Sequence, residues 1–489
     1  MSIKRLQAIA DTTIATYNNE LGGVTQNGNM GAADSLEIYS INVDEFVGHE
    51  NPSVSRTFVK FDLDQVQDLR DANKIPDSGS VKFYLKLFNV EHAETLPKDF
   101  YLSVLPISSS WEEGTGLDMD EYVDAGYDPD LGGGRGTTWL YRGNIETVEE
   151  DNLWINAGGD FIGDAIGDPN ASLVKDVYFE NGYEDLKVDV TDIVEKHLNS
   201  QITAYGFAIK LAEGYEDTAS DEGITQSYYT KKFSARSSEY FFKRPILEAR
   251  WETQLKDDRG NFYASSSFLS TENTQSLFLY ANVNGILKDV GATSVKIYTI
   301  SNPTTASSPI ATDTSLTQIM DGVYRADLVV NTTASTVYDF WYKDTTLIQS
   351  GSFNIKTRSL MNYNEEEKYV ISLKNLKNSY KKDEVAKFRI FSRPKNWSPN
   401  FYTVSTSDIT TTIYKNLYYK IVRVVDEYVV FDYDTDDKGT LTSYDKNGNY
   451  FELDLSMLEN GYSYIIKLAL LENGELREFQ ENFKFKVEQ

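Results

Sequence analysis

Short segments in which apolar and polar residues alternate recur along most of the chain. The segment from Arg56 to Leu63 shows the pattern clearly, because successive side chains of a strand point to opposite faces. One face carries Phe58 and Lys60, and the face expected to be buried carries Thr57, Val59, Phe61 and Leu63. Clusters of Gly, Asn and Asp separate such segments, so residues 1–252 are predicted to form a jelly-roll-like β-sandwich.

One short segment of this part is predicted to be helical. In Asp192–Asn199 the residues Ile193, Val194, His197 and Leu198 form a single stripe at helical spacing. Asp192 is in a position to cap the helix. We expect it to be a connector between strands.

A long segment, residues 111–169, is rich in Gly, Asp and aromatic residues. Loops of this length are usually functional or packed on a neighbour. The segment contains three tryptophans, Trp111, Trp139 and Trp154. We expect it to cover one end of the sandwich or to meet a partner, and these three indoles are the candidate interaction surface.

Two further domains are predicted after the first. Polar, turn-forming residues between Glu252 and Phe262 mark a boundary, and residues 263–356 then show the strand rhythm of an immunoglobulin-like sandwich. Residues 369–489 follow a second polar stretch and are predicted to form another immunoglobulin-like β-sandwich. There, Asn447-Gly448 and Asn473-Gly474 indicate tight antiparallel hairpins. The predicted fold class is therefore all-β.

The two later domains share a local pattern that ends in a tyrosine before a strand. It reads Gly322-Val323-Tyr324 in the first and Gly461-Tyr462-Ser463-Tyr464 in the second. Each resembles the tyrosine corner of immunoglobulin-like folds, in which the phenol bonds back to the backbone.

Composition supports this picture and narrows the partners. The 33 Tyr and 25 Phe favour pleated, half-buried surfaces. A formal net charge of -28 repels phosphate backbones and anionic lipids, so neither nucleic acid nor a membrane is an expected partner. The chain has no cysteine, hence no disulfides. No apolar run approaches the ~18 residues of a membrane helix, and no such run follows the basic N-terminus, so we expect synthesis in a host cytoplasm.

Seven short motifs in the first 250 residues occur in the order found in one family of β-sandwich modules. They are Ala10-Asp11-Thr12-Thr13-Ile14, Gly28-Asn29-Met30-Gly31-Ala32, the strand from Arg56 to Leu63, Trp111-Glu112-Glu113-Gly114, Val188 to Val194, Gly206 to Leu211, and Arg244 to Glu248. Together they resemble the DNRLRE family, which is similar in shape to carbohydrate-binding jelly rolls. The long segment 111–169 departs from the compact pattern of that family.

The resemblance implies a structural or adhesive module rather than a catalyst. With immunoglobulin-like domains appended, the chain resembles bacteriophage virion proteins of the neck, tail or capsid surface. It therefore implies location in a virion, with other virion proteins as partners in a symmetric, multi-copy assembly.

The residue types needed for catalysis do not form a recognisable pattern. The three histidines, His49, His92 and His197, lack the paired spacing of a zinc site. No G-x-S-x-G elbow and no cysteine nucleophile are present. The Gly132–Thr138 stretch lacks the spacing of a phosphate-binding loop. We therefore predict that the chain is not an enzyme and needs no cofactor.

Calcium is the one ion for which the sequence offers candidates. Asp118, Asp120, Asp128 and Asp130 supply paired hard oxygen ligands, although a solvated acidic loop is the favoured interpretation. The stretch Asp432–Gly439 begins like an EF-hand loop but has Asp437 where Gly is needed and Ser443 where Glu is needed. A charged hairpin tip is the prediction there.

Three functions remain in competition. The first is a non-enzymatic virion structural protein that acts through protein contacts. The second is a carbohydrate-binding adhesive or receptor-binding fibre protein, in which exposed indoles stack on a host-surface glycan. Its candidate indoles are Trp111, Trp139, Trp154, Trp341 and Trp397. The third and weakest is a polysaccharide-degrading enzyme that uses a pair among the 75 acidic residues.

Overall fold

A computed structural model describes most of the chain, and it divides into two compact units. The described residues are 2–18, 24–41, 53–117, 136–143, 152–212, 214–216, 227–269, 273–357, 369–395 and 411–489, apart from positions 73, 78, 94 and 305. One unit is Ile3–Trp251, which we call the N-terminal sandwich. The other comprises Met1–Ser2 and Glu252–Gln489. Among the described residues, no helix is long and apolar enough to cross a membrane.

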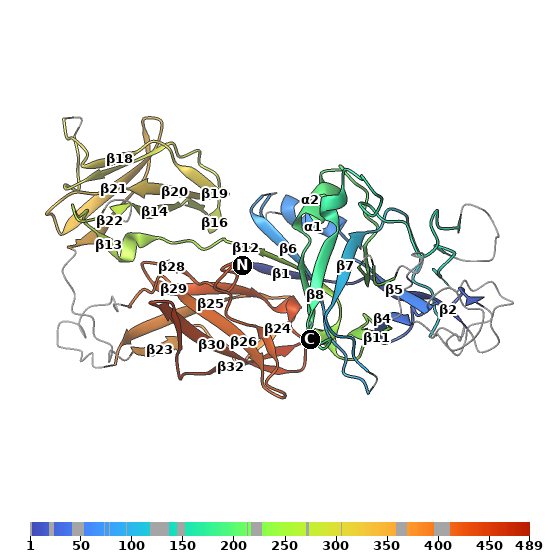
Figure 1. The fold of residues 1–489 in the computed structure, drawn as a ribbon. Coiled ribbons are helices and arrows are strands. Elements are labelled where there is room, and N and C mark those ends of the chain that lie inside the picture. Colours follow the sequence, from blue (N-terminus) through green and yellow to red (C-terminus); the bar gives the residue numbers. More distant parts are fainter. Residues whose placement is uncertain are drawn as a thin grey trace. The chain divides into compact units, whose positions relative to one another are not determined.

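The N-terminal sandwich consists of two antiparallel sheets (Figure 1). The smaller has the order β1 (Ile3–Gln7), β12 (Ile246–Trp251), β6 (Val81–Leu87) and β9 (Leu186–Asp189). The larger, called the eight-stranded sheet, has the order β11 (Tyr228–Ser234), β4 (Ser35–Ile41), β5 (Ser53–Lys60), β10 (Phe207–Leu211), β7 (Phe100–Pro106) and β8 (Lys175–Phe179). Two further strands extend it: β2 (Ala10–Asn18) pairs with β5, and β3 (Val24–Thr25) pairs with β2.

A main core lies between these two sheets. Val59, Phe61 and Leu63, from the strand face that the alternation predicted to be buried, belong to it. The first strand, β1, pairs with the last strand, β12, so the unit closes where the chain enters and leaves it. This pairing makes the main core a closed unit of residues 3–251.

The second unit contains two sandwiches. The middle sandwich has a sheet of β13 (Phe262–Tyr263), β22 (Thr346–Lys356), β21 (Thr336–Lys343), β17 (Ser294–Tyr298) and β18 (Ala311–Asp313). Its other sheet is β14 (Gln275–Tyr280), β20 (Val323–Leu328) and β19 (Thr317–Met320), with a small hairpin of β15 (Asn282–Val283) and β16 (Ile286–Leu287).

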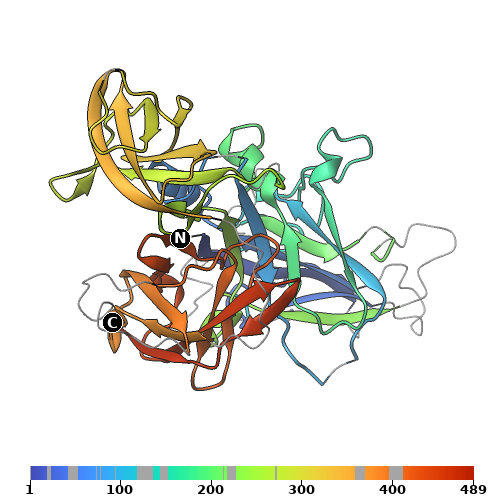
Figure 2. The same cartoon turned by 90° about the vertical axis from the view of Figure 1, so that its left-hand side faces the viewer.

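The C-terminal sandwich also has two sheets, drawn in orange and red in Figure 2. One is β23 (Tyr369–Leu373), β25 (Val385–Pro394), β29 (Gly448–Asp454) and β28 (Ser443–Asp445). The other is β24 (Ser379–Lys381), β32 (Phe483–Glu488), β30 (Ser463–Glu472), β26 (Leu417–Arg423) and β27 (Val429–Phe431), with β31 (Glu475–Glu478) on β30.

The predicted fold class is confirmed, because strands far outweigh helices in the described chain and these strands form sandwiches. Both predicted Asn-Gly turns lie next to antiparallel pairs. β28 and β29 turn through Lys446 and Asn447, and Gly448 is the first residue of β29, paired with Asp445. β30 and β31 turn through Asn473 and Gly474, which both have positive φ. Positive φ at both central residues is the geometry that this dipeptide favours.

Only one of the two predicted tyrosine corners has the expected bond. The buried Tyr464 hydroxyl donates to the carbonyl of Glu459, five residues upstream, at 2.7 Å. The Tyr324 hydroxyl instead donates to the carboxylate of Asp289 and accepts from the N–H of Gly291. Tyr324 therefore binds a loop more than 30 residues upstream rather than a carbonyl close to it in sequence, and the prediction of a tyrosine corner there was wrong.

The two α-helices belong to the N-terminal sandwich and lie side by side, linked by an ion pair (Figure 1). The predicted helix exists as α2 (Thr191–Leu198), but Asp192 does not cap it. The chain enters the helix one residue earlier, and the Asp192 carboxylate pairs with Lys175 at 2.7 Å. The helix α1 (Asp64–Asp71) was not predicted, and its Arg70 contacts Glu195 of α2 at 2.5 Å.

The polar segment between Glu252 and Phe262, predicted as a boundary, contacts both sandwiches of the second unit. Asp258 accepts from the Tyr444 hydroxyl of the C-terminal sandwich at 3.1 Å and from the Ser276 N–H of the middle sandwich at 2.9 Å. Arg259 forms a two-pronged pair with the buried carboxylate of Asp339, at 2.8 Å for each nitrogen. The segment is therefore held by specific bonds on both sides.

A buried glutamate organises the smaller sheet of the N-terminal sandwich. Glu248 on β12 is fully buried and contacts Arg5 and Lys86 at 2.6 Å and Arg250 at 2.7 Å. Burial raises the pKa of Glu248, but the charges of these three cations together outweigh it and hold the pKa well below its usual range. Burial lowers the pKa of Lys86 to about 8. One carboxylate is therefore the shared counter-ion of three cations, which come from three adjacent strands.

We expect Glu248→Gln to lower the free energy of unfolding of the N-terminal sandwich by about 3–5 kcal/mol, because three partly buried cations would lose their shared counter-ion. Urea titration of the purified chain measures this change. Glu239→Gln, at an exposed position of the same unit, is the control and should leave the midpoint unchanged. Equal midpoints for both variants would contradict the assignment.

Candidate interaction surface

The three tryptophans of segment 111–169 lie in a second hydrophobic core on the outer face of the eight-stranded sheet. Trp111, Trp139 and Trp154 are only 5%, 8% and 5% exposed. The rings of Trp111 and Trp154 lie 5.8 and 5.7 Å from the ring of Phe58, which points outward from β5. Both faces of β5 are therefore buried, whereas the alternation had predicted one.

This placement corrects the expectation that the three indoles form an exposed interaction surface. The Trp111 indole N–H donates to the Tyr205 carbonyl at 2.9 Å, and that of Trp154 donates to the Thr138 carbonyl at 3.0 Å. Trp341, another proposed sugar-stacking residue, is fully buried in the middle sandwich. A buried ring has no face to offer to a sugar. Trp397 lies outside the described residues.

A network of hydrogen bonds links the start of this segment to the turn that contains Asn29. The Asn29 side-chain nitrogen donates to the carbonyls of Glu113 and Thr137 at 2.9 and 2.7 Å, and its oxygen accepts from the Gly31 and Gly116 N–H groups. A Cβ on Gly116 would lie 1.9 Å from the Asn29 carbonyl oxygen, so glycine is required there. Two of the DNRLRE-like motifs thus meet in space.

Beside this network, two carboxylates contact Arg236, one through its guanidinium and one through its backbone N–H. Arg236 pairs with Glu113, and its backbone N–H donates to Asp11 at 2.6 Å. Asp11 is buried, and none of the described residues donates a hydrogen bond to its Oδ1. Burial raises the pKa of Asp11 to about 7, the backbone bond from Arg236 opposes this, and the Glu113 charge adds to it. Asp11 is therefore half protonated near neutral pH.

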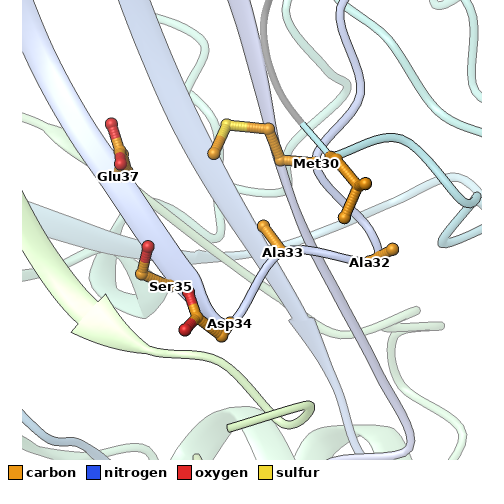
Figure 3. Close-up of a pocket in the computed structure, with 7 residues that line it drawn as sticks. Met30, Ala32, Ala33, Asp34, Ser35 and Glu37 are labelled. Carbon is orange, nitrogen blue, oxygen red and sulfur yellow. The ribbon is translucent and has the colours of Figure 1, made fainter. Parts of the chain in front are cut away.

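The cavity shown in Figure 3 lies next to the same turn. It has a volume of about 530 Å³ and is lined by Met30, Ala32, Ala33, Asp34, Ser35, Glu37 and Leu117. The Glu37 carboxylate pairs with Lys232 at 3.0 Å. The cleft thus combines an apolar floor with an ion-paired carboxylate, which suits contact better than acid–base chemistry.

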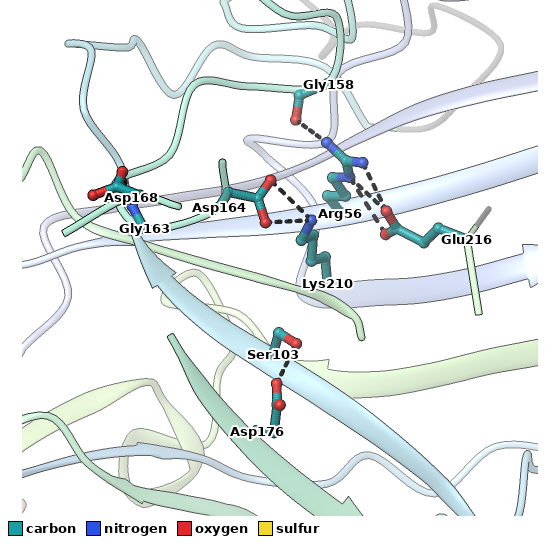
Figure 4. A network of polar contacts seen from close by, with 9 residues as sticks. All are labelled: Arg56, Ser103, Gly158, Gly163, Asp164, Asp168, Asp176, Lys210 and Glu216. Atoms are coloured by element: carbon teal, nitrogen blue, oxygen red, sulfur yellow. Dashed lines mark hydrogen bonds and ion pairs between the residues drawn. The ribbon is translucent and has the colours of Figure 1, made fainter. Parts of the chain in front are cut away.

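A polar strip continues the outer face of the eight-stranded sheet beyond the second core (Figure 4). Arg56 on β5 pairs with Glu216 at 2.7 Å and lies over the Trp139 ring. On the neighbouring strands, Lys210 contacts Asp164 at 3.1 Å. Farther along, Ser103 donates to the exposed Asp176 at 2.5 Å. Two ion pairs and one hydrogen bond fix the side chains of the strip, so it forms an ordered surface.

Two tyrosines that the sequence reasoning missed lie at the end of this strip. Tyr101 on β7 and Tyr178 on β8 are direct cross-strand partners, with ring centroids 5.1 Å apart, and are 42% and 50% exposed. The Tyr178 hydroxyl donates to Asp99 at 2.7 Å, and this bond raises its pKa to about 12. The alternation of Tyr101 with the buried Phe100 and Leu102 was the available signal.

Two loops of segment 111–169 present isoleucines to solvent. Ile155 and Ile166 are 87% and 104% exposed. The buried Asp160 carboxylate accepts from the N–H groups of Ile155 and Asn156 at 3.1 and 2.9 Å. Asp168 accepts from Gly163 and Asn170 at 3.0 and 2.7 Å, closing the loop around Ile166. Each isoleucine is therefore displayed by a loop with its own internal bonds.

The metal candidates are only partly covered by the structure. Asp118, Asp120, Asp128 and Asp130, proposed as calcium ligands, lie outside the described residues, as does His49. Within the described ranges, no group of three or more His, Asp or Glu side chains is arranged to hold a metal ion. On α2, His197 accepts from the Ala204 N–H through Nδ1 at 3.1 Å, which is a structural contact.

The EF-hand-like stretch is not a hairpin tip. The strands on either side of it, β27 and β28, belong to different sheets, so the stretch crosses between sheets. Asp434 accepts from the N–H groups of Asp437 and Gly439 at 3.1 and 3.0 Å. The carboxylate that sequence reasoning considered as a metal ligand thus holds its own loop.

Comparisons with known proteins show weak structural resemblances. No family model and no curated protein matches the chain, so the likeness to DNRLRE modules stays a prediction. Fibronectin(III)-like modules of CbhA from Clostridium thermocellum match 49% of this chain and 93% of theirs (12% identity, TM-score 0.14). The adhesin InvE of Yersinia pseudotuberculosis matches 45% of this chain and 61% of its own (16% identity, TM-score 0.14). The alpha-2-macroglobulin of E. coli matches 98% of this chain and 20% of its own (8% identity, TM-score 0.15). At such TM-scores, the functional argument rests on this chain's own residues.

Asp11 should make stability depend on pH. Its pKa is about 7 in the folded chain and near 3.8 when unfolded, so between these values the folded state binds the extra proton and stability falls as pH rises. We expect Asp11→Asn to remove this slope, so that the variant loses less stability than the wild type between pH 4 and 7. Thermal melting of both chains across this range gives the difference. A constant difference would contradict the raised pKa.

Proposed function

We propose that the chain is a non-enzymatic structural protein of a bacteriophage particle, at the neck, tail or capsid surface, that acts through contacts with other virion proteins in a multi-copy assembly. The order of its parts supports this proposal. A jelly-roll-like sandwich precedes two further sandwiches, and the motifs that resemble DNRLRE modules form structural bonds around Asn29 and Glu113.

The observation that carries the proposal is the display of Ile155 and Ile166. Both large apolar side chains stand in water on loops held by internal bonds, and because water contact of such side chains is unfavourable, their burial against a partner would be favourable. Burial of one isoleucine in a partner contributes roughly 1.5–3 kcal/mol. The internal bonds reduce the entropy that would be lost on binding.

The acidic residues near these loops indicate which charge the partner's surface should carry. Asp164 and Asp168 lie on either side of Ile166 in the sequence, and the chain as a whole is strongly acidic. An acidic rim favours a partner protein whose apolar pockets are bordered by Lys or Arg. It disfavours an anionic membrane surface as the target.

A carbohydrate-binding adhesive remains the second candidate, supported by the exposed tyrosine pair rather than by the tryptophans. Calcium binding by the aspartates of residues 118–130 stays a proposal alongside it. A polysaccharide-degrading enzyme gains no support from the polar strip, since its described carboxylates Asp164, Asp176 and Glu216 are each engaged with a neighbouring side chain.

Replacing the displayed isoleucines should prevent incorporation into particles. We expect Ile155→Asp combined with Ile166→Asp to lower the amount of chain in purified particles at least about tenfold, because two apolar contacts would become buried charges. Quantitative mass spectrometry of particles grown with each variant measures this.

The control is Ile300→Asp, an exposed isoleucine of the middle sandwich, which should enter particles normally. Thermal melting of the purified variants shows whether folding is unchanged. Absence of the wild-type chain from particles would overturn the proposed location, and normal incorporation of the double variant would overturn the role of the two loops.

A further inference from the structure

We propose that the Tyr101–Tyr178 pair and the adjoining polar strip form a binding site for a neutral oligosaccharide. The site lies on the exposed outer face of β7 and β8, at the edge of the eight-stranded sheet. It deepens the second candidate function above and does not depend on the particle role, because it concerns other residues and a different class of ligand.

The floor of the site is aromatic. The two phenol rings lie 5.1 Å apart with 46° between their planes, and about half of each side chain is exposed. A pyranose ring presents an apolar face of C–H groups, and an aromatic ring with a polar tip is the side chain that packs on such a face. Two rings placed side by side offer a surface longer than one sugar unit.

Hydrogen-bonding groups border this floor. Ser103 lies two residues from Tyr101 along β7, and Asp176 lies two residues from Tyr178 along β8. Two residues of a strand span about 7 Å, so this polar pair lies about that far from the tyrosine pair. Asp176 is exposed, so its carboxylate faces solvent where a sugar hydroxyl would donate. At the opposite end, the bond from Tyr178 fixes the position of Asp99. Acceptors thus lie at both ends of the aromatic floor.

The ion pair shown in Figure 4 forms the next row of the site. Lys210 on β10 is the cross-strand partner of Ser103, and Asp164 holds its ammonium at 3.1 Å. The pair supplies donors and acceptors in fixed positions, so their ordering costs little on binding. It also marks where segment 111–169 stops covering the sheet.

The charge around the floor selects among sugars. The acidic groups around the floor include Asp99 and Glu180, which act on Tyr178, and Asp176. Lys210, the cation of the next row, is paired with Asp164. A uronic acid or sialic acid would meet net negative charge, whereas a neutral hexose or N-acetylhexosamine would not. We therefore assign neutral oligosaccharides as the ligand class.

The test uses the full chain and defined probes. Neutral oligosaccharides of glucose, galactose and N-acetylglucosamine, together with a uronate oligosaccharide of matching length, are titrated by calorimetry and by NMR of the tyrosine rings. We expect at least one neutral probe to bind, with clearly weaker binding of the uronate probe. Tyr101→Ser and Tyr178→Ser should each weaken binding about tenfold or more.

Two controls separate binding from folding. Tyr229→Ser replaces a tyrosine on β11 that is 46% exposed at the other edge of the same sheet, and it should bind as the wild type does. Tyr101→Phe keeps the ring and should retain most of the affinity. The proposal is overturned if no neutral probe binds, if both serine variants bind normally, or if Tyr229→Ser loses binding equally.

Discussion

The burial of Phe58 on the outer face of β5 is the contact on which the N-terminal sandwich depends. A sandwich strand normally faces the core on one side and water on the other. Here, Trp111 and Trp154 pack on the outward ring of Phe58, so a long segment whose described residues form none of the named strands becomes a third layer. Because that layer has its own core, its loops can hold Ile155 and Ile166 in solvent, and its edge leaves the tyrosine pair uncovered.

A second constraint keeps this layer in register with the sheet. The Asn29 side chain bonds to backbone groups of residues 113, 116 and 137, which lie far from it in sequence. Such bonds satisfy buried peptide groups that no strand ladder reaches. The same solution recurs in the second unit, where Asp258 accepts from both sandwiches. Polar side chains thus join parts that hydrophobic packing alone would leave free to slide.

The sequence predicted the features that depend on local rules and missed those that depend on distant contacts. The all-β class, the Asn473-Gly474 turn and the corner at Tyr464 follow from alternation, backbone preference and a five-residue reach. Helix α1 was missed because its Arg70 pairs with Glu195, more than a hundred residues away. The buried outer face was missed because alternation identifies two faces but cannot show what covers the second. The exposed tyrosines were missed for the same reason, since alternation places Tyr101 and Tyr178 on the outer face without showing that nothing covers them there.

The acidic character of the chain has a structural cause as well as a surface effect. Long loops contain backbone N–H groups without ladder partners, and each needs an acceptor if it is to be ordered. Asp160, Asp168 and Asp434 each accept from two backbone N–H groups of their own loops. At these three positions the carboxylate charge is stabilised by peptide donors. Part of the charge of -28 thus orders loops, and the remainder sets which partners can approach.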